Sequence, residues 1–142
     1  MGAVTRDSVL YSNVFTNSFV ADARDRAGRA VPLPFEHTVV AGELIGDIVN
    51  LTEIPFGAEV VGLELVTDGI VSTLEIGDAA LTNRLMLATN LTAAETHGIL
   101  AFAGMRFRPV GPASTVVFGT WSVANPGAGG IFKGRLWIIP GA

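Results

Sequence analysis

The chain has 142 residues, a formal net charge of −4 and no cysteine. This length suits a single domain with its own apolar core, and the lack of cysteine excludes disulfide scaffolds, zinc ribbons and thiol nucleophiles. Nine basic residues scattered through an acidic chain do not make a phosphate-binding stripe, so we expect no nucleic-acid partner.

Charged residues make up only 15% of the chain, and its mean hydropathy is +0.50. An average soluble domain carries about 25% charged residues, so we expect part of the apolar surface to face another subunit. No membrane partner is expected, because the longest uncharged stretch, 109–132, contains three prolines and five glycines. The N-terminus lacks a basic segment followed by an apolar helix, so the chain should be soluble and not exported.

Residues 1–34 are predicted to form an N-terminal arm, followed by a β-sandwich domain at 35–142. The arm contains Tyr11, Phe15 and Phe19 without the period of a strand or a helix, so no regular element of the domain is expected to bury them. We expect these aromatic residues to pack against a partner. Three arginines of the arm are expected to pair with carboxylates of that partner: Arg24, Arg26 and Arg29.

The rest of the chain is predicted to hold eight short strands, because apolar and polar residues alternate between turns rich in Gly and Pro. The expected strands are 35–41, 44–51, 59–68, 72–76, 83–89, 99–108, 114–123 and 131–139. The alternation is clearest in the last one, where Phe132, Leu136 and Ile138 share a face opposite Lys133 and Arg135.

In the segment 59–68, Val61 is expected to share the apolar face of the strand with Leu63 and Leu65. Residues 91–98 are the one place where a helical turn is expected, with Thr92 as its N-cap. Eight antiparallel strands in a chain of this length indicate a two-sheet jelly roll or a closed barrel.

No arrangement of residues indicates catalysis or a bound cofactor, so we do not expect an enzyme. The glycines of 125–132 do not form a nucleotide-binding motif and are expected in a hairpin loop. The two histidines, His37 and His97, are sixty residues apart and do not make a metal-binding pair. We expect His37 to be half-buried and hydrogen-bonded on an apolar strand face, and His97 to be solvated.

Acidic pairs are the remaining candidates for a metal site, and we expect none of them to bind one. Asp22 and Asp25 have Arg24 and Arg26 as neighbours, which neutralise them. Two other pairs supply too few ligands for a hard cation: Glu43 with Asp47, and Glu75 with Asp78.

Trp121 and Trp137 are candidates for exposed aromatic residues that bind sugars. The apolar excess favours a different role, in which they pack under the arm or against a neighbouring subunit. Trp137 is expected on the strand face that carries Lys133 and Arg135. We therefore assign both tryptophans to a subunit interface, with a carbohydrate-binding module as the alternative.

The stretch DIVNLTEIPFGAEVVGLELVTDG, followed by STLEIGDAA, resembles a pattern in small structural proteins of tailed bacteriophages. In these proteins a strand ends in a turn of the type Leu-x-x-Leu/Ile-Pro-x-Gly-Ala, and a later short strand closes in Ile-Gly. The resemblance covers about residues 36–80, and its matching residues are Leu51, Ile54, Pro55, Gly57, Ala58, Ile76 and Gly77.

The proteins that the chain resembles are head decoration (cement) proteins, which form trimers on the outside of the capsid lattice. The resemblance implies an all-β jelly-roll β-sandwich of about eight antiparallel strands with an extended N-terminal arm. It also implies a non-enzymatic, homotrimeric virion protein that is made in the host cytoplasm and lies on the outer capsid surface, where it bridges subunits of the major capsid protein. The alternative is a tail- or head-associated carbohydrate-binding or host-adhesion module.

Overall fold

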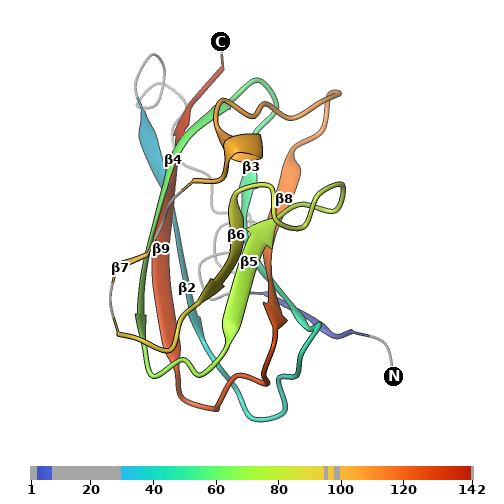
Figure 1. Cartoon of the computed structure of the whole chain (residues 1–142). Coiled ribbons are helices and arrows are strands. Elements are labelled where there is room, and N and C mark those ends of the chain that lie inside the picture. Colours follow the sequence, from blue (N-terminus) through green and yellow to red (C-terminus); the bar gives the residue numbers. More distant parts are fainter. Residues whose placement is uncertain (1–2, 8–29, 95, 98–99, 142) are drawn as a thin grey trace.

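A computed structural model of the chain describes residues 3–7, 30–94, 96–97 and 100–141, which form two β-sheets packed face to face (Figure 1). The strands in the described part are β1 (Thr5–Asp7), β2 (Val31–Thr38), β3 (Ile48–Ile54), β4 (Glu59–Asp68), β5 (Thr73–Gly77), β6 (Met86–Asn90), β7 (Thr96–His97), β8 (Thr115–Ser122) and β9 (Ile131–Ile139). A 3-10 turn, η3 (Phe102–Gly104), precedes β8. No helix among the described residues is long and apolar enough to cross a bilayer.

The strands are paired as in one long hairpin that has been rolled up. β2 pairs with β9, β3 with β8, β4 with β7, and β5 with β6. Rolling then brings β4 beside β9 and β5 beside β8, which gives the sheets β3-β8-β5-β6 and β2-β9-β4-β7. This nested pairing is a jelly roll, so the predicted all-β sandwich is confirmed. β1 adds a short parallel strand to the outer edge of β3.

The core lies between the two sheets and is centred on the ring of Phe132 in β9. The centroids of the Phe35 and Trp121 rings lie 6.3 and 5.8 Å from that of Phe132, both in edge-on geometry, which is favourable for aromatic pairs. Leu136 and Ile138 follow Phe132 on the buried face, as the alternation predicts. Every second residue of β9 therefore faces the opposite sheet.

β4 has the predicted bounds, 59–68. The prediction of which residues face the core is wrong at the start of the strand. A β-bulge between Val60 and Gly62 inserts an extra residue opposite β9 and reverses the alternation on one side of it. Val60 is consequently buried in place of Val61, while Leu63 and Leu65 are buried as expected.

The first two predicted domain strands, 35–41 and 44–51, are displaced in the structure to Val31–Thr38 and Ile48–Ile54. Residues between them form turns, because backbone amides there bond to acidic side chains instead of a neighbouring strand. β2 thus begins inside the segment assigned to the arm. Most of that arm, including Tyr11, Phe15, Phe19, Arg24, Arg26 and Arg29, lies outside the described residues.

Two further predictions are wrong in the described part of the chain. Residues 91–94 do not form a helical turn, and the short strand β7 follows them and pairs with β4 through Leu65 and His97. The predicted strand at 99–108 is replaced over residues 100–108 by η3 and irregular loop. Phe102 and Met105 of this segment are exposed, while Leu100 and Phe107 are partly buried against the core, so its apolar residues do not mark a buried strand.

Candidate interaction surface

Six exposed side chains lie on two loops at the end of the sandwich that also carries the C-terminus (Figure 1). We call them the apical surface: Phe56, Phe102, Met105, Arg106, Arg108 and Val110. Phe102 is 99% exposed and Val110 is 94% exposed. Large apolar side chains gathered in this way on a small protein mark a binding surface more often than a solvated one.

The longer of the two loops, 101–114, is held firmly on the body of the protein. The Ala101 amide donates to the Leu85 carbonyl at 2.9 Å, and Val60 both accepts from Arg106 and donates to the Phe107 carbonyl at 2.9 Å. A Cβ on Gly104 would lie 2.7 Å from the Arg84 carbonyl oxygen, so only glycine allows this close approach. The loop is thus ordered by the fold before any partner arrives.

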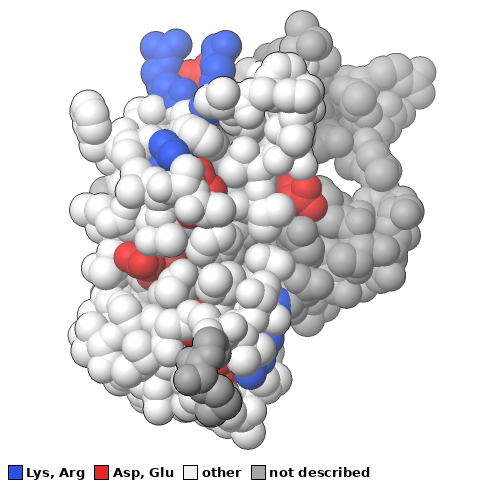
Figure 2. Space-filling model, turned by 90° about the vertical axis from the view of Figure 1, so that its right-hand side faces the viewer, with Lys and Arg blue, Asp and Glu red and all other residues white. Residues whose placement is uncertain are grey.

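Two arginines of this loop share one carboxylate. Glu59 accepts from Arg106 Nε at 2.7 Å and from Arg108 Nη2 at 2.8 Å, and the hydrogen bonds from Arg108 and Arg106 lower the pKa of Glu59. The Glu59 side chain is largely covered, whereas those of Arg106 and Arg108 are 77% and 63% exposed. Basic side chains consequently project from this end of the molecule (Figure 2), with one positive charge in excess.

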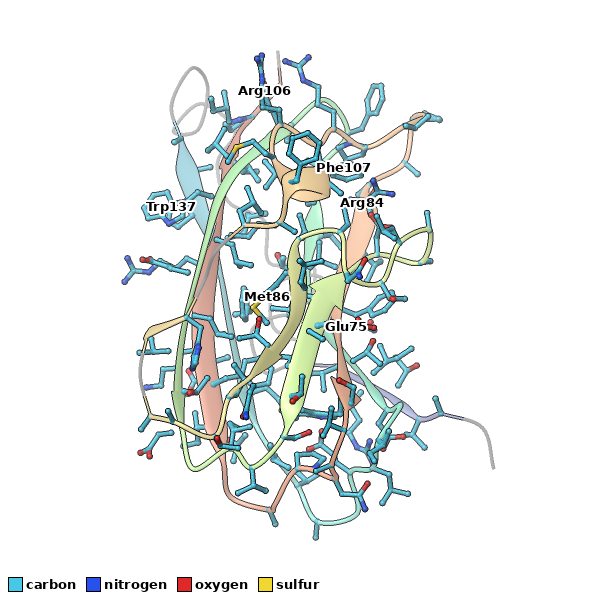
Figure 3. All side chains as sticks on the ribbon, in the orientation of Figure 1. Glu75, Arg84, Met86, Arg106, Phe107 and Trp137 are labelled. Atoms are coloured by element: carbon cyan, nitrogen blue, oxygen red, sulfur yellow. The ribbon has the colours of Figure 1, made fainter. Side chains whose placement is uncertain are left out.

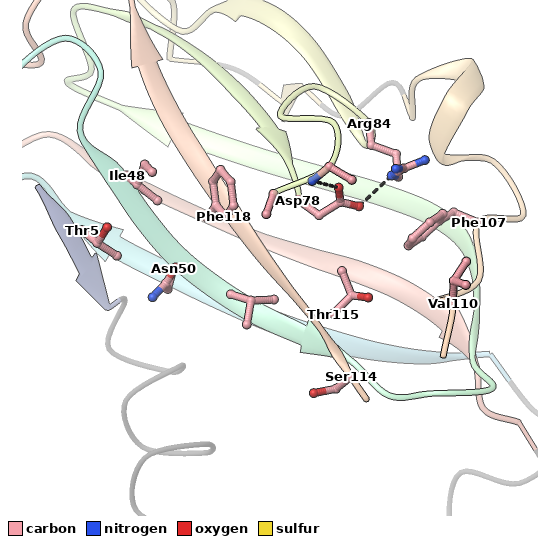
Figure 4. A pocket seen from close by; sticks show the side chains of 13 residues that line it. Thr5, Ile48, Asn50, Asp78, Arg84, Phe107, Val110, Ser114, Thr115 and Phe118 are labelled. Atoms are coloured by element: carbon pink, nitrogen blue, oxygen red, sulfur yellow. Dashed lines mark hydrogen bonds and ion pairs between the residues drawn. The ribbon is translucent and has the colours of Figure 1, made fainter. Parts of the chain in front are cut away.

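A hollow of about 630 Å³ opens on the outer face of the β3-β8-β5 sheet beside the apical surface (Figure 4). Phe107 and Val110 line one wall of the hollow. The Arg84 guanidinium lies 4.3 Å from the centre of the Phe107 ring and donates to Asp78 at 2.6 Å, so this wall is fixed. The remaining lining is Thr5, Ile48, Asn50, Ala79, Ala80, Ser114, Thr115, Val116 and Phe118, which suits an apolar side chain better than a charged group.

This surface is not evident from the sequence, because the apolar residues of ILAFAGMRFR predict a strand. Two features of that stretch point the other way: Gly104 interrupts it, and arginines flank Phe107. Phe, Met and Arg together are the residue types that protein interfaces favour.

At the opposite end, two acidic residues predicted as weak metal candidates have structural roles. Glu43 is buried and accepts from the Val40 amide at 2.7 Å and from Trp121 Nε1 at 3.0 Å, and His37 Nε2 lies 3.0 Å from Glu43 Oε2. His37 is buried and hydrogen-bonded, somewhat more deeply than expected. This cluster holds the turn after β2.

Asp47 and Asp78 also hold backbone. Asp47 accepts from the amides of Val4 and Leu44 and from Arg6 at 2.8 Å, with the amide of Val4 as the main cause of its lowered pKa. Asp78 accepts from two amides of its own turn, and Glu75 accepts from Thr82. Within the described ranges, no three side chains of His, Cys, Asp or Glu are grouped so as to hold a metal ion.

The two tryptophans have different positions. Trp121 is 1% exposed and packs in the core, so the assignment of this residue to a subunit interface or a sugar platform is wrong. Trp137 is half-buried on the outer face of β9 (Figure 3), on the side that carries Lys133 and Arg135 as expected. Its place in a subunit interface remains a prediction, and so do the partner contacts of the arm.

No family model matches the chain, and no curated protein matches it. Solved structures do. A chain in the capsid of Ralstonia phage GP4 has a TM-score of 0.77 at 18% identity, over 98% of this chain and 99% of that one. A chain in the capsid of cyanophage Pam1 has a TM-score of 0.60 at 18% identity, over 85% of this chain and 92% of that one. A chain in the capsid of Helicobacter pylori bacteriophage KHP30 has a TM-score of 0.52 at 17% identity, over 79% of this chain and 93% of that one. At these identities the likeness shows a shared fold.

Proposed function

We propose that this chain is a non-enzymatic structural protein of a phage virion, which decorates the outer capsid surface and bridges subunits of the major capsid protein. The observation that carries the proposal is the match to a chain of the Ralstonia phage GP4 capsid over nearly the full length of both chains. Two more phage capsids contain chains of the same fold.

Stabilisation by such a protein requires binding alone. A homotrimer attaches through several equivalent contacts, so weak single contacts add up to firm attachment. In this proposal the arm supplies part of the contact through Tyr11, Phe15 and Phe19 and through its three arginines, and copies of the chain meet around Trp137. The protein would be made in the host cytoplasm and join the virion there.

Shells of the cognate major capsid protein that lack this chain provide the test. Purified full-length chain should co-sediment with the shells up to a fixed stoichiometry and raise the temperature at which they dissociate. Shells that neither bind the chain nor gain stability would contradict the proposal. A glycan array run in parallel tests the adhesion alternative, which the burial of Trp121 makes weaker.

A further inference from the structure

We infer that the apical surface is the part of the body that docks on the shell, against a protein surface where carboxylates lie beside an apolar patch. This inference rests on the proposed function and assigns a location and a chemistry to its contact. It concerns the described body of the protein and is separate from the predicted contact of the arm.

The composition of the apical surface is the first reason. Its members are two Phe, one Met, two Arg and one Val, and aromatic residues, Met and Arg are enriched at interfaces while Lys and Glu are depleted. Phe102, the first residue of η3, is almost wholly exposed. An aromatic side chain in that position supplies an anchor that loses little rotamer freedom on binding.

Preorganisation is the second reason. Glu59 holds the guanidiniums of Arg106 and Arg108 side by side, and the backbone bonds of Val60 hold the loop that carries them. Arg106 itself has a φ of 61°, a left-handed conformation that is unfavourable for a residue with a side chain and that collects at functional positions. Because the fold has already ordered these groups, binding a partner costs less conformational entropy.

Charge indicates the kind of partner. The bonds to Glu59 use Nε of Arg106 and one terminal nitrogen of Arg108, and each guanidinium has five N–H donors. An incoming carboxylate therefore finds donors that point outward. A second copy placed on this surface by a two-fold axis would instead set arginine against arginine, which disfavours self-association here.

The hollow beside the arginines completes the site. Its wall of Phe107 and Val110 adjoins the apical loop, so an apolar side chain of the partner can enter while a neighbouring carboxylate meets Arg106 or Arg108. The opposite end also carries exposed apolar residues, among them Leu44 and Ile45. Arg6 beside them pairs with Asp47 and its side chain is only 25% exposed, so it offers a partner's carboxylate less than Arg106 and Arg108 do.

Binding to shells of the cognate major capsid protein tests the inference with four full-length variants. Phe102→Ser and the double variant Arg106→Ala/Arg108→Ala change the apical surface. Leu44→Ser is the matched apolar control at the opposite end, and Arg135→Ala is the matched control for an exposed arginine paired with a glutamate. Each apical variant should bind at least about tenfold more weakly, and each control within about twofold of the unmodified chain.

Salt provides a second readout, since screening weakens exposed charge contacts. Binding of the unmodified chain should fall as salt rises, and binding of the double arginine variant should depend on salt much less. All altered side chains are exposed, and thermal unfolding of each variant verifies that it is folded.

The outcomes separate the two proposals. If the unmodified chain binds shells and the apical variants bind equally well, the inference is wrong and the proposed function stands. Loss of binding in Leu44→Ser alone also overturns it, because the opposite end then docks. If light scattering shows that the apical variants no longer self-associate, the apical surface binds a second copy of the chain and the inference is again wrong. Shells that do not bind the unmodified chain remove the proposed function and this inference with it.

Discussion

Glu43 is a carboxylate with three hydrogen-bonding neighbours and almost no contact with water. It accepts from Val40 and Trp121 and lies beside His37. Replacing it with alanine leaves these groups buried without a partner, so we expect Glu43→Ala to lower the free energy of unfolding by about 3 kcal/mol. Urea denaturation measures this loss.

The matched control for that variant is Glu64→Ala. Glu64 pairs with Arg135 at 3.4 Å, and both side chains are about half exposed. An exposed pair contributes little, so the loss should stay below about 1 kcal/mol. Equal losses in the two variants would mean that the buried cluster does not hold the turn after β2.

Val123 is strained. Its φ is 70°, which is a rare conformation for a β-branched residue, and it is 81% exposed, so no burial compensates. Asparagine tolerates this conformation better, and we expect Val123→Asn to raise the free energy of unfolding by about 1 kcal/mol. Val110→Asn, at an equally exposed valine without positive φ, should change it by less than about 0.5 kcal/mol. If both substitutions change the free energy of unfolding by the same small amount, the backbone at Val123 is not strained.

At the scale of elements, alternation predicted the strands whose two faces differ in environment. β9 has the predicted bounds because Lys133 and Arg135 face solvent while Phe132 and Leu136 face the core. The same pattern failed in β4 because a bulge shifts the register at Val60. A bulge is set by pairing with a distant strand, and the sequence of one strand does not reveal it.

The candidate site was harder to predict than the fold. Apolar residues of 100–108 could signal either a buried strand or an exposed contact, and only the packing of Gly104 against Arg84 decides between them. The apolar excess led us to expect Trp121 at a subunit interface, whereas it is buried with a hydrogen-bond acceptor, Glu43, that lies 78 residues away in the chain. Long-range partners of this kind decide burial, and residue spacing does not contain them.

β1 is held to the body partly by the charge of Asp47. It is a three-residue strand, and Asp47 ties it to the body through the Val4 amide and Arg6. Asp47→Asn should lower the free energy of unfolding at pH 7 by about 2 kcal/mol, because the amide keeps one acceptor and loses the charge.

The pH dependence of that difference follows from the lowered pKa of Asp47. A lowered folded pKa contributes stability above the unfolded value, and that stability is lost as the pH falls through the folded value. The gap between the unmodified chain and Asp47→Asn should therefore be full at pH 7 and shrink below about pH 4. Urea titrations at pH 7 and pH 3 measure it, and a gap that does not shrink would contradict a role for the ionised form.

At the scale of the whole molecule, the sandwich limits how copies can associate. Within the described strands, β2 forms one edge of its sheet, and Pro32 and Pro34 remove two of its amide donors. Prolines on an edge strand block the addition of another strand. Association of copies through the β2 edge is therefore disfavoured, and Trp137 lies instead on a sheet face.

We expect the purified protein to have three times its chain mass of 14.8 kDa in light scattering, because a surface with so few charges favours contact between subunits. Trp137→Ala should shift this trimer toward monomer by at least about 2 kcal/mol per interface, since tryptophan is a frequent hot spot. Phe102→Ser, which changes an exposed side chain of the apical surface, should leave the trimer intact. Thermal unfolding is needed alongside, because Trp137 also packs over Gly62, and only a folded monomeric variant supports the interface. A monomer of the unmodified chain at micromolar concentration would contradict the trimer, while a trimer that survives Trp137→Ala would place the subunit contact on another face.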